Sequence, residues 1–270
     1  MKLQDFLSGG ASVALEGYKK PTLTNGITKA HIVAFEAPAG FGKTATISRL
    51  IDEQGQGECV LVVLPNTSLM AQYRLFHKNW TYIFSGGGDG SVADAAMNEI
   101  VARNRRVVIT QACAEMIARK IGVDGVFTEA LADYNVYFDE VVNSKHGVAI
   151  SVEKGKERAH HWLQFIGKSA SVDGNIYEAY QPDMIQDILN TNTGKATFKE
   201  MMFHLASGQQ VQAIEYQDST KYVSVGDKAT FRFLGSCKSF MMAGANVEKM
   251  SFVVRAKELF GRGLDLLPVD

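Results

Sequence analysis

The sequence predicts an α/β fold in which a mainly parallel sheet is flanked by helices. Strand-like and helix-like segments alternate from residue 31 to residue 140. Several of the strand-like segments are continuous Val, Ile and Leu runs, which is typical of strands buried on both faces of a parallel sheet. A glycine-bearing loop ending in Lys43-Thr44 joins the first strand to the first helix, at the edge where doubly wound sheets bind ligands.

The elements follow in order along the chain. The predicted strands are 31–36, 59–64, 81–84, 106–110 and 135–138, and the predicted helices are 44–53, 68–78, 91–103 and 112–121. After residue 140, helical stretches at 154–166, 182–189 and 197–207 come without obvious parallel strands, and strand signals return at 221–225, 229–234 and 239–242. We therefore expect an N-terminal segment at 1–30, the first part of the core at 31–140, a mostly helical insertion at 141–220, and the completion of the core with the start of an interdomain linker at 221–270.

The composition is that of a folded chain without a strong charge bias. Of 270 residues, 46% are hydrophobic and 21% charged, which allows a sizeable core, and the net charge of −1 excludes a global basic field. The three scattered cysteines lack metal-ligand spacing, which favours a reducing compartment. The sequence shows neither a signal-peptide core nor an apolar run that could cross a bilayer. We expect a soluble, cytoplasmic protein without a membrane partner, the nucleoid or nucleus being alternatives.

The loop at 37–44, APAGFGKT, predicts a nucleoside triphosphate site. Backbone N–H groups of such a loop point inward, and the following helix adds the positive end of its dipole. Lys43 is expected to reach the β- and γ-phosphates and Thr44 to ligate Mg²⁺. The first position is Ala37, where the phosphate-loop pattern has Gly. The expected nucleotide-binding residues are Ala39, Gly40, Phe41, Gly42, Lys43, Thr44 and Ala45.

The strand predicted at 135–138 ends in Asp139-Glu140, two adjacent carboxylates. A phosphate loop needs such a partner on another buried strand. Asp139 is expected to hold Mg²⁺. Glu140 is expected to orient and polarise the attacking water, while Lys43 stabilises the transferring phosphoryl group. Glu140 and Lys43 are thus the predicted catalytic residues.

With these segments the chain resembles the first motor domain of superfamily 2 helicases, the DEAD/DEAH-box kind. The resemblance implies a RecA-like phosphate-loop domain that uses ATP and Mg²⁺ and binds single- or double-stranded nucleic acid, DNA or RNA. Asp139-Glu140-Val141-Val142 departs from the family at its third and fourth letters, so the chain is not a strict DEAD-box or DEAH-box member.

Three segments resemble the family's nucleic-acid motifs. The segment 61–74, LVVLPNTSLMAQYR, resembles the second motif, although Thr67-Ser68 replaces the usual Arg-Glu. The segment 84–87 resembles the paired-glycine motif, and 107–112 resembles the next motif, with Gln111 in place of Pro. The resemblance implies nucleic-acid contacts at Pro65, Asn66, Thr67, Gly86, Thr110 and Gln111.

Two further segments resemble motifs around the nucleotide. The segment 239–245, SFMMAGA, resembles the Ser-Ala-Thr motif, which couples the nucleotide to the nucleic acid. Its expected coupling residues are Ala243, Gly244 and Ala245, and the hydroxyls that the family uses to bond the Asp-Glu segment are absent. The segment 17–25 is similar to the adenine-reading segment, with Asn25 where the family has Gln.

The family's second motor domain is missing after residue 245. Either the sequence is the first domain of a longer protein, which we favour, or it is a naturally short protein that borrows its arginine in trans. We expect a helicase or translocase motor whose hydrolysis is weak without a second RecA-like domain. The alternatives are a phosphate-loop ATPase of another branch, such as an AAA-type or packaging motor, and a degenerate nucleotide-sensing module that docks a partner.

Overall fold

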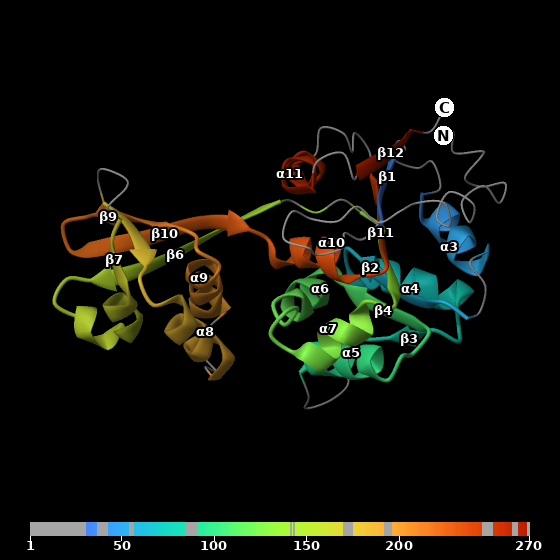
Figure 1. The fold of residues 1–270 in the computed structure, drawn as a ribbon, viewed down its shortest axis with the longest axis horizontal. Coiled ribbons are helices and arrows are strands. Elements are labelled where there is room, and N and C mark those ends of the chain that lie inside the picture. Colours follow the sequence, from blue (N-terminus) through green and yellow to red (C-terminus); the bar gives the residue numbers. More distant parts are fainter. Residues whose placement is uncertain are drawn as a thin grey trace. The chain divides into compact units, whose positions relative to one another are not determined.

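The computed structural model describes residues 31–36, 43–53, 57–84, 91–140, 142, 144–169, 175–191, 196–244, 251–260 and 264–268. The chain forms two compact units (Figure 1). One comprises the described residues up to Ser144 and from Lys228 onward, and the other is Lys145–Asp227. Sequence analysis expected the insertion at 141–220.

The first unit is built on a sheet of seven parallel strands among the described residues. The strands are β1 (His31–Glu36), β2 (Cys59–Leu64), β3 (Thr81–Tyr82), β4 (Arg106–Thr110), β5 (Tyr134–Phe138), β11 (Ser239–Gly244) and β12 (Leu264–Pro268). Their order is β12-β1-β11-β5-β2-β4-β3, and every pairing is parallel. The predicted α/β class is confirmed, and the arrangement is that of a RecA-like domain.

Helices cover both faces of this sheet (Figure 1). One face carries α3 (Lys43–Glu53) and α4 (Thr67–Phe76), and the other carries α5 (Val92–Val101), α6 (Gln111–Ala118), α7 (Gly125–Leu131), α10 (Phe233–Ser236) and α11 (Ser251–Phe260). Right-handed crossovers explain the division. The connections through α3 and α4 run along the sheet in one direction, and those through α5, α6, α7 and α11 run back.

The core beneath α3 and α4 explains why β2 reads as a continuous apolar run. Val60, Val62 and Leu64 pack with Ile47 of α3 and Met70 of α4. The intervening residues of β2 point to the opposite face and are equally buried. A strand covered by helices on both faces has no solvent side, so its sequence does not alternate.

The strand predicted at 229–234 is wrong. The segment forms a 3₁₀ helix, Ala229–Arg232, followed by α10. The Glu115 carboxylate of α6 accepts hydrogen bonds from the N–H groups of Ala229 (2.8 Å) and Thr230 (3.4 Å). These bonds satisfy the free donors at the start of the helical segment.

The second unit is not mostly helical, which corrects the expectation for the insertion. Its strands are β6 (Lys145–Glu153), β7 (Ile166–Lys168), β8 (Ile176–Ala179), β9 (Val211–Glu215) and β10 (Ser219–Asp227), in the order β6-β10-β9-β8-β7 and antiparallel throughout. The helices α8 (Pro182–Thr191) and α9 (Ala196–Ala206) accompany this sheet. The helix predicted at 154–166 is replaced by two short 3₁₀ segments, Glu157–Ala159 and His161–Phe165, before β7.

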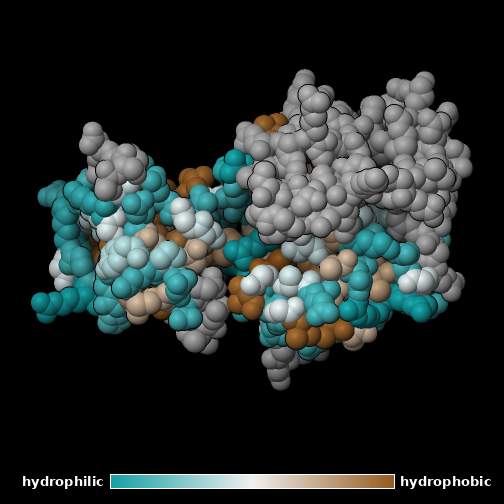
Figure 2. Space-filling model, in the orientation of Figure 1, coloured by the Kyte–Doolittle hydropathy of each residue, from teal (hydrophilic) through white to brown (hydrophobic). Residues whose placement is uncertain are grey.

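Hydrophilic residues cover much of the described surface in Figure 2, with smaller hydrophobic patches between them. Leu75 and Phe76, at the end of α4, are 71% and 82% exposed.

In the part of the chain that the structure describes, no helix combines the length and apolar character needed to span a bilayer.

Candidate nucleotide site

The start of α3 and the end of β5 bring two of the predicted site residues together. Thr44 lies in the first turn of α3, and Asp139 directly follows β5. The Thr44 hydroxyl donates a 2.7 Å hydrogen bond to Oδ2 of Asp139, across 95 positions of sequence. The N–H of Asp139 donates to the Val63 carbonyl of β2 at 3.1 Å, which holds the end of β5 in place.

Burial dominates the electrostatics of Asp139. Its side chain is only 5% exposed. Burial raises the pKa of the carboxyl to about 6, against the lowering effects of the Thr44 hydrogen bond, the Lys43 charge and the Tyr73 hydroxyl, while Glu140 raises it slightly further. Asp139 Oδ1 is buried without a hydrogen-bond partner among the described residues.

These donors fit Mg²⁺. The ion prefers oxygen ligands and is commonly held by one or two protein oxygens together with phosphates and water. Thr44 supplies a hydroxyl and Asp139 a carboxylate with one unbonded oxygen. The described residues contain no group of three His, Cys, Asp or Glu side chains arranged for a metal.

Glu140 is exposed beside Asp139. Its backbone carbonyl accepts a 3.3 Å hydrogen bond from the Gln111 side-chain amide, which joins the start of α6 to the end of β5. The exposed Glu140 therefore lies on a segment that this hydrogen bond anchors.

The predicted nucleic-acid residues of the described chain lie at the same edge of the sheet. Pro65, Asn66 and Thr67 follow β2, and Thr110 ends the neighbouring strand β4, in register with Leu64. The Asn66 side chain accepts from the N–H of Leu69 (2.9 Å), and Thr110 Oγ1 accepts from the N–H of Cys113 (3.3 Å). Both side chains therefore cap the helices that follow them.

Ala243 and Gly244, two predicted coupling residues, end β11 between β1 and β5. Both are buried. Several predicted residues lie outside the described part of the chain: Asn25, Ala39, Gly40, Phe41, Gly42, Gly86 and Ala245.

Tyr73 is not among the site residues that the sequence predicts. Tyr73 lies on α4, is 1% exposed, and its hydroxyl has no hydrogen-bond partner of good geometry among the described residues. A cavity of about 570 Å³ between α3 and α4 is lined by Thr44, Ser48 and Tyr73, among others. The sequence carries one usable signal, because Met70 and Tyr73 share the inward face of the predicted helix, and a hydroxyl on an inward face needs a partner.

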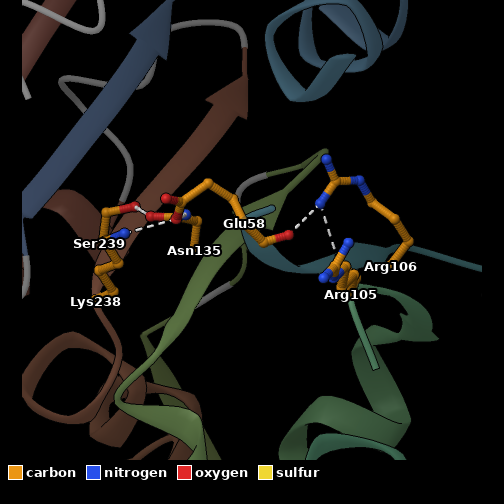
Figure 3. A network of polar contacts seen from close by, with 6 residues as sticks. All are labelled: Glu58, Arg105, Arg106, Asn135, Lys238 and Ser239. Carbon is orange, nitrogen blue, oxygen red and sulfur yellow. Dashed lines mark hydrogen bonds and ion pairs between the residues drawn. The ribbon is translucent and has the colours of Figure 1, made fainter. Parts of the chain in front are cut away.

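The opposite edge of the sheet carries a structural network instead (Figure 3). Glu58 Oε2 accepts from Lys238 Nζ at 2.6 Å and from Asn135 Nδ2 at 3.1 Å. The Ser239 hydroxyl donates to Asn135 Oδ1 at 2.5 Å, and Arg106 donates to the Glu58 carbonyl. The network joins the starts of β2, β4, β5 and β11, far along the strands from Asp139.

Comparisons with known proteins find matches among solved structures. No protein-family model matches the chain. No curated protein matches it either. Among solved structures the chain is similar to Xpd4 of S. tokodaii, an XPD-family helicase, with 11% sequence identity and a TM-score of 0.48. The match covers 98% of this chain and 61% of that one, so the chain spans less than two thirds of its neighbour. At this level the likeness does not bear on activity.

Proposed function

We propose that the chain is an ATP-dependent motor domain, the first motor domain of a nucleic-acid helicase or translocase. The observation that supports this best is the 2.7 Å bond between Thr44 and Asp139. The two residues come from the two segments expected to bind Mg·ATP, and the fold brings their side chains together at the edge of a parallel sheet where ligands bind.

Each residue has a stated role in this proposal. Loop residues 39–42 cradle the phosphates through backbone N–H groups, Lys43 stabilises the transferring phosphoryl group, and Asn25 contacts the adenine. Thr44 and Asp139 hold Mg²⁺, which when bound supplies positive charge that neutralises the phosphate oxygens. Glu140 orients the attacking water and accepts its proton.

The nucleic-acid backbone binds at the same edge of the sheet in this proposal. Pro65–Thr67 and Thr110-Gln111, with Gly86, contact phosphates through backbone N–H groups and short polar side chains. The segment 243–245 couples this edge to the nucleotide. A second RecA-like domain in the full-length protein supplies the arginine that closes the site, so hydrolysis by this chain alone is slow.

The test is steady-state ATP hydrolysis with and without single-stranded DNA or RNA. Lys43→Ala removes the cation at the phosphates and is expected to abolish nucleotide binding. Glu140→Gln is expected to keep binding and to lower turnover by at least about 100-fold, because the amide cannot accept the proton. Glu129→Gln, at an exposed carboxylate on α7, is the matched control and is expected to leave both unchanged.

Stimulation by one polymer identifies the nucleic acid. Full turnover by Glu140→Gln contradicts the role given to that residue. Nucleotide binding without hydrolysis, unchanged by either polymer, contradicts the motor function and favours a nucleotide-sensing module.

A further inference from the structure

We infer that Tyr73 is a positioning residue for the Asp139 carboxylate and that it ties α4 to the nucleotide site. The inference rests on the proposed function, because it assigns a partner to a residue expected to hold Mg²⁺. It concerns a side chain that the Mg·ATP motif itself does not contain.

Two buried polar atoms near each other carry the inference. The Tyr73 hydroxyl and Asp139 Oδ1 are both inaccessible to solvent, and neither has a hydrogen-bond partner of good geometry among the described residues. Thr44 bonds Asp139 at 2.7 Å and lines the same cavity as Tyr73, so the hydroxyl and the carboxylate belong to one site. Burial is the main cause that raises the pKa of Tyr73, and the Asp139 carboxylate raises it further. A buried polar group left without a partner costs about 1–3 kcal/mol, so a bond between the two removes two such costs at once.

The Tyr73 ring is held in place by its neighbours. Its centroid lies 5.8 Å from that of His77 and 6.3 Å from that of Trp80, and it packs in the core cluster beneath α3 and α4. The ring therefore cannot turn its hydroxyl out to solvent. The Ser48 hydroxyl of α3 lines the same cavity and lowers the pKa of Tyr73, against the larger effect of burial.

Together Thr44 and Tyr73 define the orientation of the carboxylate. Thr44 bonds Oδ2, and Tyr73 is the donor available to Oδ1. Each carboxylate oxygen accepts more than one bond, so both oxygens keep capacity for a cation. Groups that orient a metal-binding carboxylate in this way typically change metal affinity by about 10–100-fold when removed.

Tyr73 also gives α4 a mechanical role. The helix begins at Thr67, beside the residues proposed to touch nucleic acid, and it carries Tyr73 two turns later. Any movement of α4 would therefore also move the Tyr73 hydroxyl relative to Asp139.

The test measures nucleotide affinity rather than turnover. The dissociation constant of a fluorescent ADP analogue is determined with Mg²⁺ and with EDTA, and the ratio of the two gives the gain from Mg²⁺. Tyr73→Phe is expected to lower this gain by about 10-fold while the constant in EDTA is unchanged. The matched control is Tyr82→Phe, whose hydroxyl donates to the His77 carbonyl at 3.0 Å, and it is expected to change neither constant.

The outcomes separate the inference from the function on which it rests. An undiminished Mg²⁺ gain in Tyr73→Phe overturns the role of Tyr73 and leaves the proposed function standing. A parallel loss in Mg²⁺ and in EDTA also overturns it, because a positioning role does not weaken nucleotide binding without the ion. No nucleotide binding by the wild type overturns the proposed function and the inference with it.

A second variant decides the question if Tyr73→Phe does not fold. Ser48→Ala removes a hydroxyl that lines the same cavity as Tyr73 and lowers its pKa, at a half-buried position. It is expected to lower the Mg²⁺ gain about two- to threefold with the constant in EDTA unchanged. An unchanged gain overturns the inference.

Discussion

Replacing Asp139 with asparagine is expected to stabilise the ligand-free protein at neutral pH. The pKa of Asp139 is raised from 3.8 to about 6, and burial is the main cause. Because one pKa unit corresponds to about 1.4 kcal/mol, the charged carboxylate destabilises the folded state by up to about 3 kcal/mol at neutral pH. Asparagine keeps an oxygen that accepts from Thr44, so Asp139→Asn is expected to raise the free energy of unfolding by about 1–3 kcal/mol.

The effect has a defined dependence on pH. Between the unfolded pKa of 3.8 and the folded pKa of about 6, the folded protein binds a proton at Asp139 that the unfolded chain does not. The free energy of unfolding of the wild type therefore falls as the pH rises through this range. Above the folded pKa, Asp139 contributes no further dependence on pH. The advantage of Asp139→Asn is expected to be largest above pH 6 and to disappear toward about pH 4.

Urea unfolding in EDTA across this range is the assay. The two tryptophans lie in different units, Trp80 with Asp139 and Trp162 in the other, so a Trp162→Phe background restricts the fluorescence signal to the unit of interest. The exposed Asp94→Asn, in the first turn of α5, is the control, with an expected loss of about 0.3–1 kcal/mol. A less stable Asp139→Asn at neutral pH, or an advantage independent of pH, would refute the reasoning.

Two further predictions concern the rest of the first unit. Hydrogen bonding to Lys238 is the main cause that lowers the pKa of Glu58, so this group stabilises the fold above pH 4.5 and the contribution is lost as the pH falls through the folded pKa. Both side chains of this pair are more than a third exposed, so the effect is small. Glu58→Gln is expected to lower the free energy of unfolding by only about 0.5–1 kcal/mol at neutral pH and to leave it unchanged in strong acid. Urea unfolding measures the effect, with Glu129→Gln as the control. The buried Tyr134 hydroxyl donates to the Asn104 carbonyl at 2.6 Å, and Tyr134→Phe is expected to cost about 1–2 kcal/mol in a calorimetric measurement. An unchanged melting temperature in Tyr134→Phe would contradict the importance of this bond.

The parallel sheet could be predicted because its strands have a simple sequence pattern. β2 and β4 occupy the predicted ranges, since strands buried on both faces must be apolar throughout. The sequence does not predict β6, because only one residue in two faces the core there, as with buried Val148 and Val152, and Gly147 and Ala149, which alternate with them, are residue types that disfavour strands. The sequence predicts a strand where the structure has the 3₁₀ helix Ala229–Arg232, because Glu115 fixes the start of this helix across more than a hundred positions of sequence.

The juxtaposition of Thr44 and Asp139 could be predicted for a different reason. The carboxyl ends of parallel strands meet at one edge, so any two residues that follow such strands are candidates for contact. This rule predicts the edge of the sheet at which the residues lie, but it does not predict the order of the strands along that edge. β11 lies between β1 and β5, and the Thr44–Asp139 bond therefore joins segments that are not adjacent in the sheet.

One difference between this sequence and the helicase motifs that it resembles concerns the surroundings of Asp139. The hydroxyls that the Ser-Ala-Thr motif would direct at the Asp-Glu segment are absent at Ala243 and Ala245. Asp139 Oδ1 is correspondingly left without a hydrogen-bond partner among the described residues, while Thr44 accounts for Oδ2. Under our inference Tyr73 provides a hydroxyl from α4, the helix that begins at Thr67, in place of one from β11. Adding Ala243→Ser to the Tyr73→Phe variant is then expected to restore part of the Mg²⁺ gain. In the wild type Ala243→Ser is expected to leave the Mg²⁺ gain unchanged, because Tyr73 already provides the hydroxyl.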